Sequence, residues 1–467
     1  MSDTRPNVLF FLTDQLRPDY LGVRDDVPVE TPNVDRLIDR GVQFTDAVCP
    51  SPVCNPSRAS IASGMEYDRC GVRGNNVDYP PCEPTLYGRL RDEGGYHVMG
   101  CGKFDLQSGF PCGLSGNHKL DEYGFSDGLY NPALNNTVHR FESDVNGDPR
   151  DPYTQYLAEE GLLQEHVEDY RRRREEGVWT ATFPTPLPQE AYYDDWITRN
   201  GLSLLADAPD DQPWFLEVSF QNPHHPWDVT EEMHGWYRDP NVEFPGPVEC
   251  DLDVAPETHQ EVRRNYAAMV EHLDRCVGRF LERLAERGEL DETLVVFTSD
   301  HGEMLGDYGL WQKLAPHHAS VGVPFVAAGP GVDTQSPRDE PTTILDLHAT
   351  FLDYAGVAPG DVDSRSLRSA FDGGAAPREV VYSGLSSWRM VYDGEHKLVR
   401  GYDPECRVGD EYEPMRAAPE NVERRLRERQ PILHDVGRSE SENVVDERPE
   451  VTRRLERELE AFRSGAK

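Results

Sequence analysis

The stretch that decides the fold is Val8-Leu9-Phe10-Phe11-Leu12, followed at once by Thr13-Asp14-Gln15. Five apolar residues in a row predict a strand buried on both faces, as in the middle of a parallel sheet. Similar apolar runs recur at residues 214–220, 294–298 and 323–328. Helical patterns lie between them, and this alternation predicts an α/β fold with a large, mostly parallel sheet sandwiched by helices.

The predicted helices are marked by apolar spacing and by end signals. Thr31 and Pro32 open a helix that Gly41 is expected to close, and Gly94-Gly95 stop another. The predicted helices cover residues 31–41, 85–93, 266–284 and 343–354, and a short strand covers residues 97–100.

The character of the sequence changes twice along the chain. Residues 107–189 hold polar loops, which predict an irregular insertion near the mouth of a site, and the charge run at 171–176 is typical of a solvated helix face. We expect a main domain over residues 1–371 and a smaller subdomain over residues 372–467. The subdomain is predicted from short antiparallel strands at 380–382, 388–392 and 396–399 and a final helix at 449–462.

The charge balance excludes several classes of partner. The 467 residues include 85 Asp and Glu against 47 Lys and Arg, a formal net charge of −38. Such an acidic surface repels nucleic acid and anionic lipid, and its even spread along the chain predicts halophilic adaptation. Nine cysteines, an odd number, and the lack of an apolar run long enough for an export signal predict a reducing, cytoplasmic environment.

Polar residues follow three of the predicted strands. Asp14 and Gln15 follow the first, His224 follows the second, and Asp300 and His301 follow the third. In parallel sheets ligands bind at the carboxyl ends of strands, and two carboxylates that meet there repel each other unless a cation lies between them. Asp14, Gln15, Asp300 and His301 therefore predict a site for one divalent ion: Ca²⁺, which we favour, or Mg²⁺ or Mn²⁺.

The segment Cys54-Asn55-Pro56-Ser57-Arg58-Ala59-Ser60-Ile61-Ala62-Ser63-Gly64 holds the most specific motif, and a helix is predicted to start at Pro56. Cys-x-Pro-Ser-Arg is the recognition signal for conversion of cysteine to Cα-formylglycine. In this context it resembles the type I, formylglycine-dependent sulfatase family of the alkaline phosphatase superfamily. The alternative interpretation is an unmodified, buried cysteine at a helix start.

Further matches to that family are spread along the chain. They are Thr31-Pro32-Asn33-Val34-Asp35-Arg36-Leu37, Gly102-Lys103-Phe104-Asp105, Pro223-His224-His225-Pro226 and the signature that runs from Ser299-Asp300-His301-Gly302-Glu303 to Lys313. Two positions depart from the family pattern. Asp14-Gln15 replaces a pair of aspartates and is similar to the phosphonate monoester hydrolase branch, so sulfate and phosphorus esters both remain open. Asp105 stands where relatives carry a histidine thought to help the intermediate collapse.

The resemblance implies an alkaline phosphatase-like fold and metal-dependent hydrolysis of a sulfate monoester. Cys54, as a hydrated aldehyde, would attack the ester through one metal-bound hydroxyl and expel sulfate through the other. The resemblance implies a metal site formed by Asp14, Gln15, residue 54, Asp300 and His301. It also implies that Arg58 and Lys103 hold the alkoxide. Lys313 and His224 would bind ester oxygens, one of them would protonate the leaving alcohol, and Asp105 or another residue would be the base. Asn75 either contacts the substrate anion or belongs to a turn, and His225 is expected to be a packing or loop residue.

The expected partners are a small-molecule or carbohydrate sulfate ester and, during maturation, the formylglycine-generating enzyme. Two other functions stay open. One is a phosphonate monoester or phosphodiester hydrolase that uses the same nucleophile, and the other is a non-catalytic, metal-stabilised relative that binds sulfated carbohydrate. The oligomeric state is not predicted by the sequence.

Overall fold

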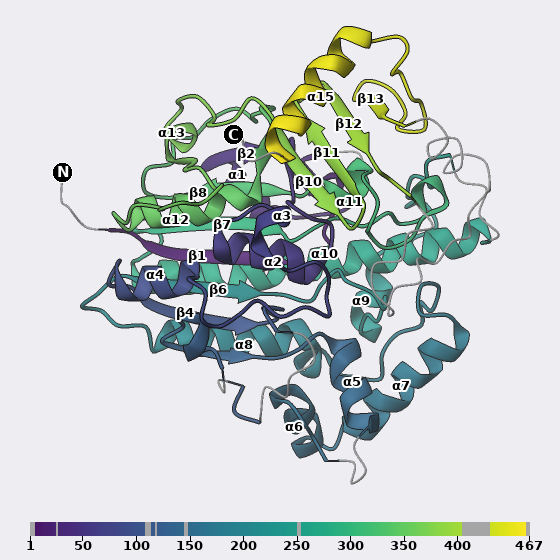
Figure 1. Ribbon diagram of the computed structural model, residues 1–467. Helices are drawn as coiled ribbons and strands as arrows, with labels where there is room; N and C mark the ends of the chain where they lie inside the picture. Colours follow the sequence, from purple (N-terminus) through teal and green to yellow (C-terminus); the bar gives the residue numbers. More distant parts are fainter. Residues whose placement is uncertain are drawn as a thin grey trace.

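The computed structural model describes residues 5–24, 27–107, 114–116, 119–143, 148–249, 254–403 and 430–463. In this part of the chain the larger sheet has seven strands, in the order β2-β8-β7-β1-β6-β4-β5 (Figure 1). They are β1 (Asn7–Thr13), β2 (Gly41–Phe44), β4 (His97–Gly102), β5 (Asp127–Tyr130), β6 (Trp214–Ser219), β7 (Thr293–Ser299) and β8 (Phe325–Ala328). The run from β7 to β5 is parallel, whereas β8 pairs antiparallel with both β7 and β2. The predicted mostly parallel sheet is confirmed.

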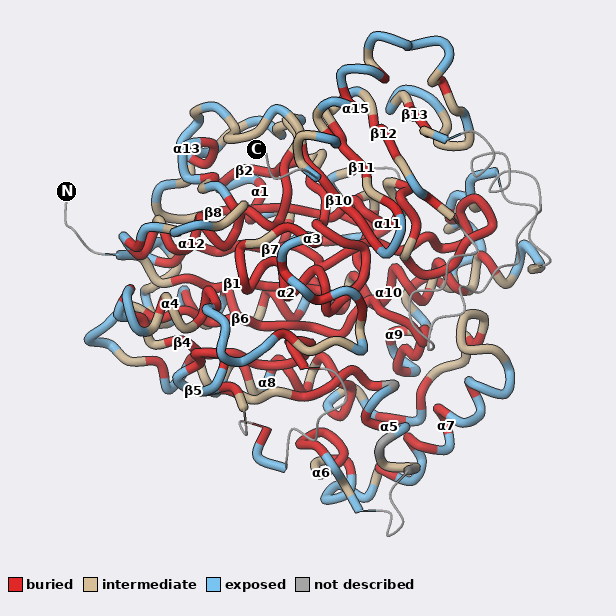
Figure 2. The backbone as a smooth tube through the Cα atoms, viewed as in Figure 1, coloured by how far each residue is buried: buried red, intermediate tan, exposed pale blue. Residues whose placement is uncertain are grey.

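Helices cover both faces of this sheet, which explains why β1 is apolar throughout. Val8, Phe10 and Leu12 belong to one buried cluster with α2, α4 and α12, and Leu9 and Phe11 belong to a second with α1, α8 and α10. Buried chain therefore runs through all three layers (Figure 2). The helices are α1 (Pro32–Ile38), α2 (Cys54–Ser63), α4 (Leu86–Asp92), α8 (Tyr193–Ala206), α10 (Pro256–Arg287) and α12 (Leu347–Tyr354). Within the described ranges, none of the helices combines the length and the apolarity needed to span a bilayer.

A second, antiparallel sheet follows in the chain, as predicted. It consists of β10 (Val381–Leu385), β11 (Trp388–Tyr392), β12 (His396–Arg400) and β13 (Ile432–Asp435), and α15 (Pro449–Arg463) packs on it (Figure 1). Met390 and Val399 face the main core, while Val391 and Leu398 join a separate cluster with α15. The sheet is thus apolar on both faces and is fused to the main body, and a domain boundary at residue 371 stays a prediction.

The segment 107–189 is not irregular in its described part, so that prediction was wrong. It holds α5 (Leu134–Ser143), α6 (Pro152–Glu159) and α7 (Leu163–Glu176), besides β5. A capping box between Asp151 and Thr154 starts α6. The charge run lies on α7, where Arg172 and Arg174 are solvated as predicted, but Arg173 is buried and its Nε lies 2.8 Å from Asp169 Oδ2. Such short helices have few apolar positions, so their periodicity is weak in the sequence.

Two predicted element boundaries were also wrong. Gly41 does not close α1, which ends at Ile38, but opens β2. A Cβ on Gly41 would lie 2.0 Å from the carbonyl oxygen of Ala327 on β8, so the close approach of two strands requires this glycine. Helix α2 begins at Cys54 and not at Pro56, so Cys54 occupies its first turn. The shorter elements are β3 (Ala47–Val48), α3 (Tyr67–Cys70), α9 (Glu231–Trp236), α11 (His318–Val321), β9 (Thr342–Thr343) and α13 (Arg368–Phe371).

The net charge of −38 predicts a stability that depends on salt. Because dissolved ions screen repulsion between exposed carboxylates, we expect the thermal midpoint of unfolding to rise between 0.1 and 1 M KCl. Calorimetry over this range measures the effect, and sorbitol at matched osmolality is the uncharged control. A midpoint that is flat in KCl, or that rises equally in sorbitol, would contradict electrostatic self-repulsion.

Candidate active site

The candidate residues meet at the carboxyl edge of the parallel strands. Asp14 follows β1, Lys103 follows β4, His224 lies in the loop after β6, and Asp300 follows β7. The N-terminus of α2 brings Cys54 to the same edge, where its sulfur lies 3.8 Å from Asp14 Oδ1. The predicted convergence of these segments is thus present, while the chemical role of each residue stays a prediction.

The start of α2 is fixed by a side chain from the following loop. The backbone N–H of Asn55 donates to Asn75 Oδ1 at 3.1 Å, and Asn55 Nδ2 donates to the Asn75 carbonyl at 3.0 Å. Asn75 therefore caps the helix that carries Cys54. Its amide oxygen faces the helix, so any contact with a substrate anion would involve its Nδ2 group.

Four residues offer donor atoms for a metal ion. Oxygens of Asp14 and Asp300, Cys54 Sγ and a nitrogen of His301 all lie within 4.8 Å of one another, and all four residues are buried. His301 Nε2 lies 3.3 Å from Cys54 Sγ, 3.7 Å from Asp14 Oδ1 and 3.5 Å from Asp300 Oδ1. The His301 Nδ1–H donates to the carbonyl of Gly302 at 3.0 Å, which leaves Nε2 with its lone pair directed into the cluster. Burial lowers the pKa of His301 to about 4, so the ring is neutral at pH 7.

Three cationic side chains surround the carboxylates. Arg58 Nε donates to Asp300 Oδ2 at 2.8 Å, and Lys103 forms ion pairs with Asp14 and, at 3.0 Å, with Asp105. Burial alone would raise the pKa of Asp14, but the positive charges of Lys103, Lys313 and Arg58 hold it well below its usual range. The buried Arg58 Nη2 has no hydrogen-bond partner within the described structure, although it lies 3.8 Å from Asp14 Oδ2.

The Cys54 thiol is not activated as it stands. Burial and the carboxylate of Asp14 raise its pKa to about 11, so the sulfur is protonated at neutral pH. A protonated thiol is a poor nucleophile. Lys313 Nζ lies 3.3 Å from the sulfur and 2.7 Å from Gln15 Oε1, so a cation directly faces position 54.

The two histidines after β6 are both buried, and they differ in their contacts. His224 Nδ1–H donates to the His225 carbonyl at 2.6 Å, which leaves Nε2 as an acceptor. His225 Nδ1 accepts from Gln15 Nε2 at 3.4 Å, and its ring packs against Trp179. Burial is the main cause that lowers the pKa of both rings well below the usual value.

Glu303 is a buried residue of the site to which the sequence assigned no role. Its carboxylate accepts from the backbone N–H groups of Leu305 at 2.9 Å and Gln312 at 2.6 Å, and also from Gln15 Nε2. Because the Gln15 amide nitrogen is held in this way, its oxygen is turned toward Lys313. Glu303 lies inside the long signature of residues 299–313, and that position was the available signal.

Backbone strain gathers at the same place. Among the described residues, eight that are not glycine have positive φ, and six of them belong to this region: Gln15, Asp105, Leu305, Tyr308, Gln312 and Leu314. Each such residue costs about 1–3 kcal/mol and persists where the surrounding structure enforces it. The two that flank Lys313, with φ of 68° at Gln312 and 83° at Leu314, turn the chain so that Lys313 points inward.

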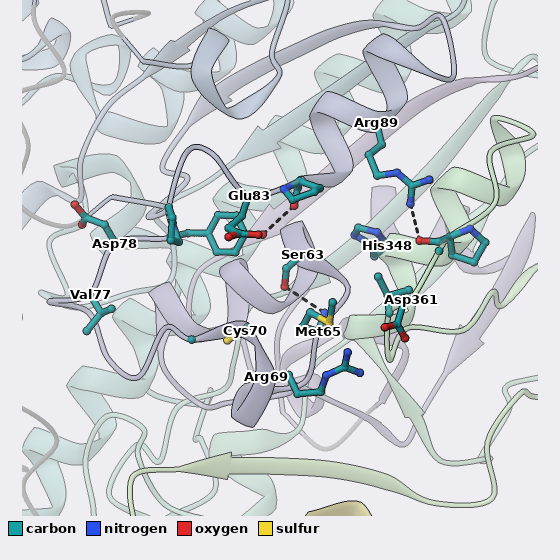
Figure 3. Close-up of a pocket in the computed structure, with 17 residues that line it drawn as sticks. Ser63, Met65, Arg69, Cys70, Val77, Asp78, Glu83, Arg89, His348 and Asp361 are labelled. Carbon is teal, nitrogen blue, oxygen red and sulfur yellow. Dashed lines mark hydrogen bonds between the residues drawn. The ribbon is translucent and has the colours of Figure 1, made fainter. Parts of the chain in front are cut away.

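Two other features of the described structure lie apart from this site: a second cluster of possible metal ligands and a cavity. Asp195, His272 and Cys276 also lie close enough to hold a metal ion. However, although burial opposes it, Cys276 and the hydrogen bond that His272 donates to Asp195 raise the pKa of His272 to about 10, which favours a protonated ring over a metal ligand. A cavity of about 670 Å³ lies at the opposite end of α2, where Ser63, Arg69 and His348 line it (Figure 3). Ser63 in its wall lies nine residues after Cys54 on α2, which corresponds to about 14 Å of helix.

Comparison with known proteins gives consistent matches. The Sulfatase family model matches residues 6–357. An arylsulfatase of Clostridium perfringens is 27% identical over 420 residues, which cover 84% of this chain and 82% of that protein. A choline-sulfatase of Rhizobium meliloti is 29% identical over 458 residues, with coverage of 89% and 82%. A phosphonate monoester hydrolase of Agrobacterium radiobacter has the same fold, with a TM-score of 0.76 at 23% identity and coverage of 99% and 96%.

Proposed function

The chain belongs to the sulfatase family and is a sulfuric ester hydrolase, and from this premise we propose that it cleaves sulfate monoesters with a formylglycine made from Cys54 and one bound divalent metal ion. The observation that carries the proposal is the buried cluster of Asp14, Cys54, Asp300 and His301, faced by Arg58, Lys103 and Lys313. The substrate class is the sulfate ester of a small molecule or a carbohydrate.

The donor set fits a hard divalent cation. His301 Nε2 lies 3.7 and 3.5 Å from oxygens of Asp14 and Asp300, and buried carboxylates gathered in this way suit Ca²⁺, Mg²⁺ or Mn²⁺. Asp14, Asp300, His301 and residue 54 would hold the ion, which would supply positive charge to acidify the attacking oxygen. Gln15 Oε1 would complete the set by exchanging its contact with Lys313.

The side chains around Cys54 suit the handling of a sulfate group. A hydrated aldehyde at position 54 would supply one hydroxyl for attack and a second for release of sulfate. The N-terminus of α2 places partial positive charge beside that position, and Lys313 is close enough to bind an ester oxygen. Lys313 is the proton donor we favour for the leaving alcohol, because the only N–H of neutral His224 is donated to a backbone carbonyl. Asp105, paired with Lys103, is the base we favour.

The decisive experiment is mass spectrometry of the tryptic peptide that spans Cys54, taken from protein made in its native host. We expect an aldehyde in place of the thiol. Only thiol in fully active protein would exclude the proposed nucleophile. A host without the formylglycine-generating enzyme would give thiol for a trivial reason, so the specific activity of the same sample is the necessary control.

A phosphonate monoester or phosphodiester hydrolase with the same nucleophile is the second candidate, because Gln15 replaces the second aspartate of the usual sulfatase pair. Ratios of kcat/KM for 4-nitrophenyl sulfate, phenyl 4-nitrophenyl phosphonate and bis-4-nitrophenyl phosphate decide between them. We expect the sulfate to be preferred, and a preference for either phosphorus ester would support the alternative.

The cytoplasm remains the compartment we propose, because the cysteines of the described ranges are unpaired.

Removal of the metal is expected to destabilise the protein, because only Arg58, Lys103 and Lys313 then neutralise the buried carboxylates of Asp14 and Asp300. An ion at about 100 times its dissociation constant adds about 2.7 kcal/mol to the free energy of unfolding. Calorimetry of chelator-treated protein during titration with Ca²⁺, Mg²⁺ and Mn²⁺ measures this gain and ranks the ions. Asp300→Asn is the control that should abolish it. A wild-type protein insensitive to all three ions would contradict the metal site.

A further inference from the structure

Trp179 presents an aromatic ring beside the active site. Its indole packs on the imidazole of His225 with ring centroids 4.0 Å apart, and His225 packs on His224 at the same separation. Trp179 is half-buried, whereas both histidines are buried. The three rings, inclined by 57° and 31° to one another, therefore form a continuous series of ring contacts, called the stack below, that runs from half-buried Trp179 to the two buried histidines.

The loop that carries Trp179 is held in place by its own carbonyl groups. The Trp179 carbonyl accepts from Trp227 Nε1 at 2.7 Å, and the Thr182 carbonyl accepts from Asn265 Nδ2 at 2.9 Å. Buried Arg173 donates to the carbonyls of Ala181 and Phe183 at 3.2 and 2.7 Å. These four anchored carbonyls, at residues 179, 181, 182 and 183, fix the position of the indole, so it is a preformed surface.

The inner end of the stack is connected to the reacting position by direct contacts. His225 Nδ1 accepts from Gln15 Nε2 at 3.4 Å, Gln15 Oε1 accepts from Lys313 at 2.7 Å, and Lys313 Nζ lies 3.3 Å from Cys54 Sγ. An ester whose sulfate is bound by Lys313 would extend its alcohol part away from Cys54, and Trp179 is the half-buried ring at the outer end of these contacts.

We infer that Trp179, backed by His225, forms a subsite for the alcohol part of the ester, and that this subsite takes a leaving group with an apolar ring face, either aryl or pyranosyl. Both kinds of ring present C–H or π faces that stack on an indole, whereas an acyclic chain does not. The inference rests on the proposed function for the identity of the ester, but the ring subsite can be tested by binding alone.

The test compares Trp179→Ala and Trp179→Phe with the wild type on 4-nitrophenyl sulfate, galactose 6-sulfate and acyclic propyl sulfate. For the ring esters we expect Trp179→Ala to raise KM about tenfold, which corresponds to about 1.4 kcal/mol, with little change in kcat. Trp179→Phe should restore most of this loss, and KM for propyl sulfate should change little. The matched control is Trp236→Ala on α9, which removes another half-buried tryptophan that contacts Arg275.

A loss for only one ring class identifies that class as the occupant. An equal loss for all three esters, or no loss for either ring ester, overturns the subsite. Calorimetric titration with 4-nitrophenol and methyl β-D-galactopyranoside separates this result from the proposed function. If the wild type cleaves no sulfate ester but binds one of these alcohols, and Trp179→Ala weakens that binding, the subsite stands and the proposed function fails. Binding unaffected by Trp179→Ala overturns the subsite.

Discussion

Replacing Cys54 by alanine is expected to lower kcat/KM by about 10⁴-fold or more, because alanine places no nucleophile beside Asp14, Asp300 and His301. Steady-state kinetics with 4-nitrophenyl sulfate, on protein made in a host that matures the cysteine, measure the loss. The control is Cys101→Ala in β4, which removes another fully buried thiol. That variant should keep most of the activity, and substantial turnover by Cys54→Ala would contradict the proposed nucleophile.

Replacing Cys54 by serine separates attack from release. A serine has a single hydroxyl, so after it accepts the sulfuryl group no second hydroxyl remains to expel sulfate. We expect a burst of product close to one equivalent of enzyme, followed by a stalled protein that carries a sulfate on residue 54. Intact-protein mass spectrometry detects the adduct. Continued turnover without an adduct would mean that water displaces the group directly and that an aldehyde is not required.

The framework of the site could be predicted because strand ends are visible in the sequence. Val8 to Leu12 form a run that only a doubly covered strand explains, and the polar residue after it must lie at the carboxyl edge. The same reasoning placed Asp300 and His224 at that edge, and the structure confirms the shared position. The resemblance, carried by the Cys54 motif and by the matched segments around Lys103 and Lys313, provided the remaining residues, since no periodicity indicates which helix start faces a given strand.

The parts that could not be predicted depend on contacts between distant segments. The bond from Asn55 to Asn75 joins residues 20 positions apart, across the rest of α2 and all of α3, and the bond from Gln15 to Glu303 joins residues 288 positions apart. Gly41 has the same local signal whether it ends a helix or lets two strands approach, and only the Ala327 carbonyl distinguishes the two. Long-range packing thus decided the details that local sequence signals left open.

The second large effect concerns stability and the charge balance of the site. Arg58→Met is expected to lower the free energy of unfolding by about 3–5 kcal/mol in the presence of a chelator, because it leaves two buried carboxylates short of a partner. Arg58 donates to Asp300 Oδ2 at 2.8 Å and lies 3.8 Å from Asp14 Oδ2, and the exposed fraction of its side chain is only 2%. Denaturant unfolding with and without Ca²⁺ measures the loss, which should shrink when Ca²⁺ takes over part of the neutralisation.

A matched control separates this effect from the general cost of removing a buried arginine. Arg378 holds Asp346 through two hydrogen bonds of 2.7 Å, and the exposed fraction of its side chain is 6%. Arg378→Met should also destabilise the protein, but by the same amount with Ca²⁺ as with chelator, since Asp346 does not belong to the cluster around Cys54. If Arg58→Met were as stable as the wild type in chelator, Asp14 and Asp300 could not both be charged there. If its loss were the same in both conditions, the cation would not lie between those carboxylates.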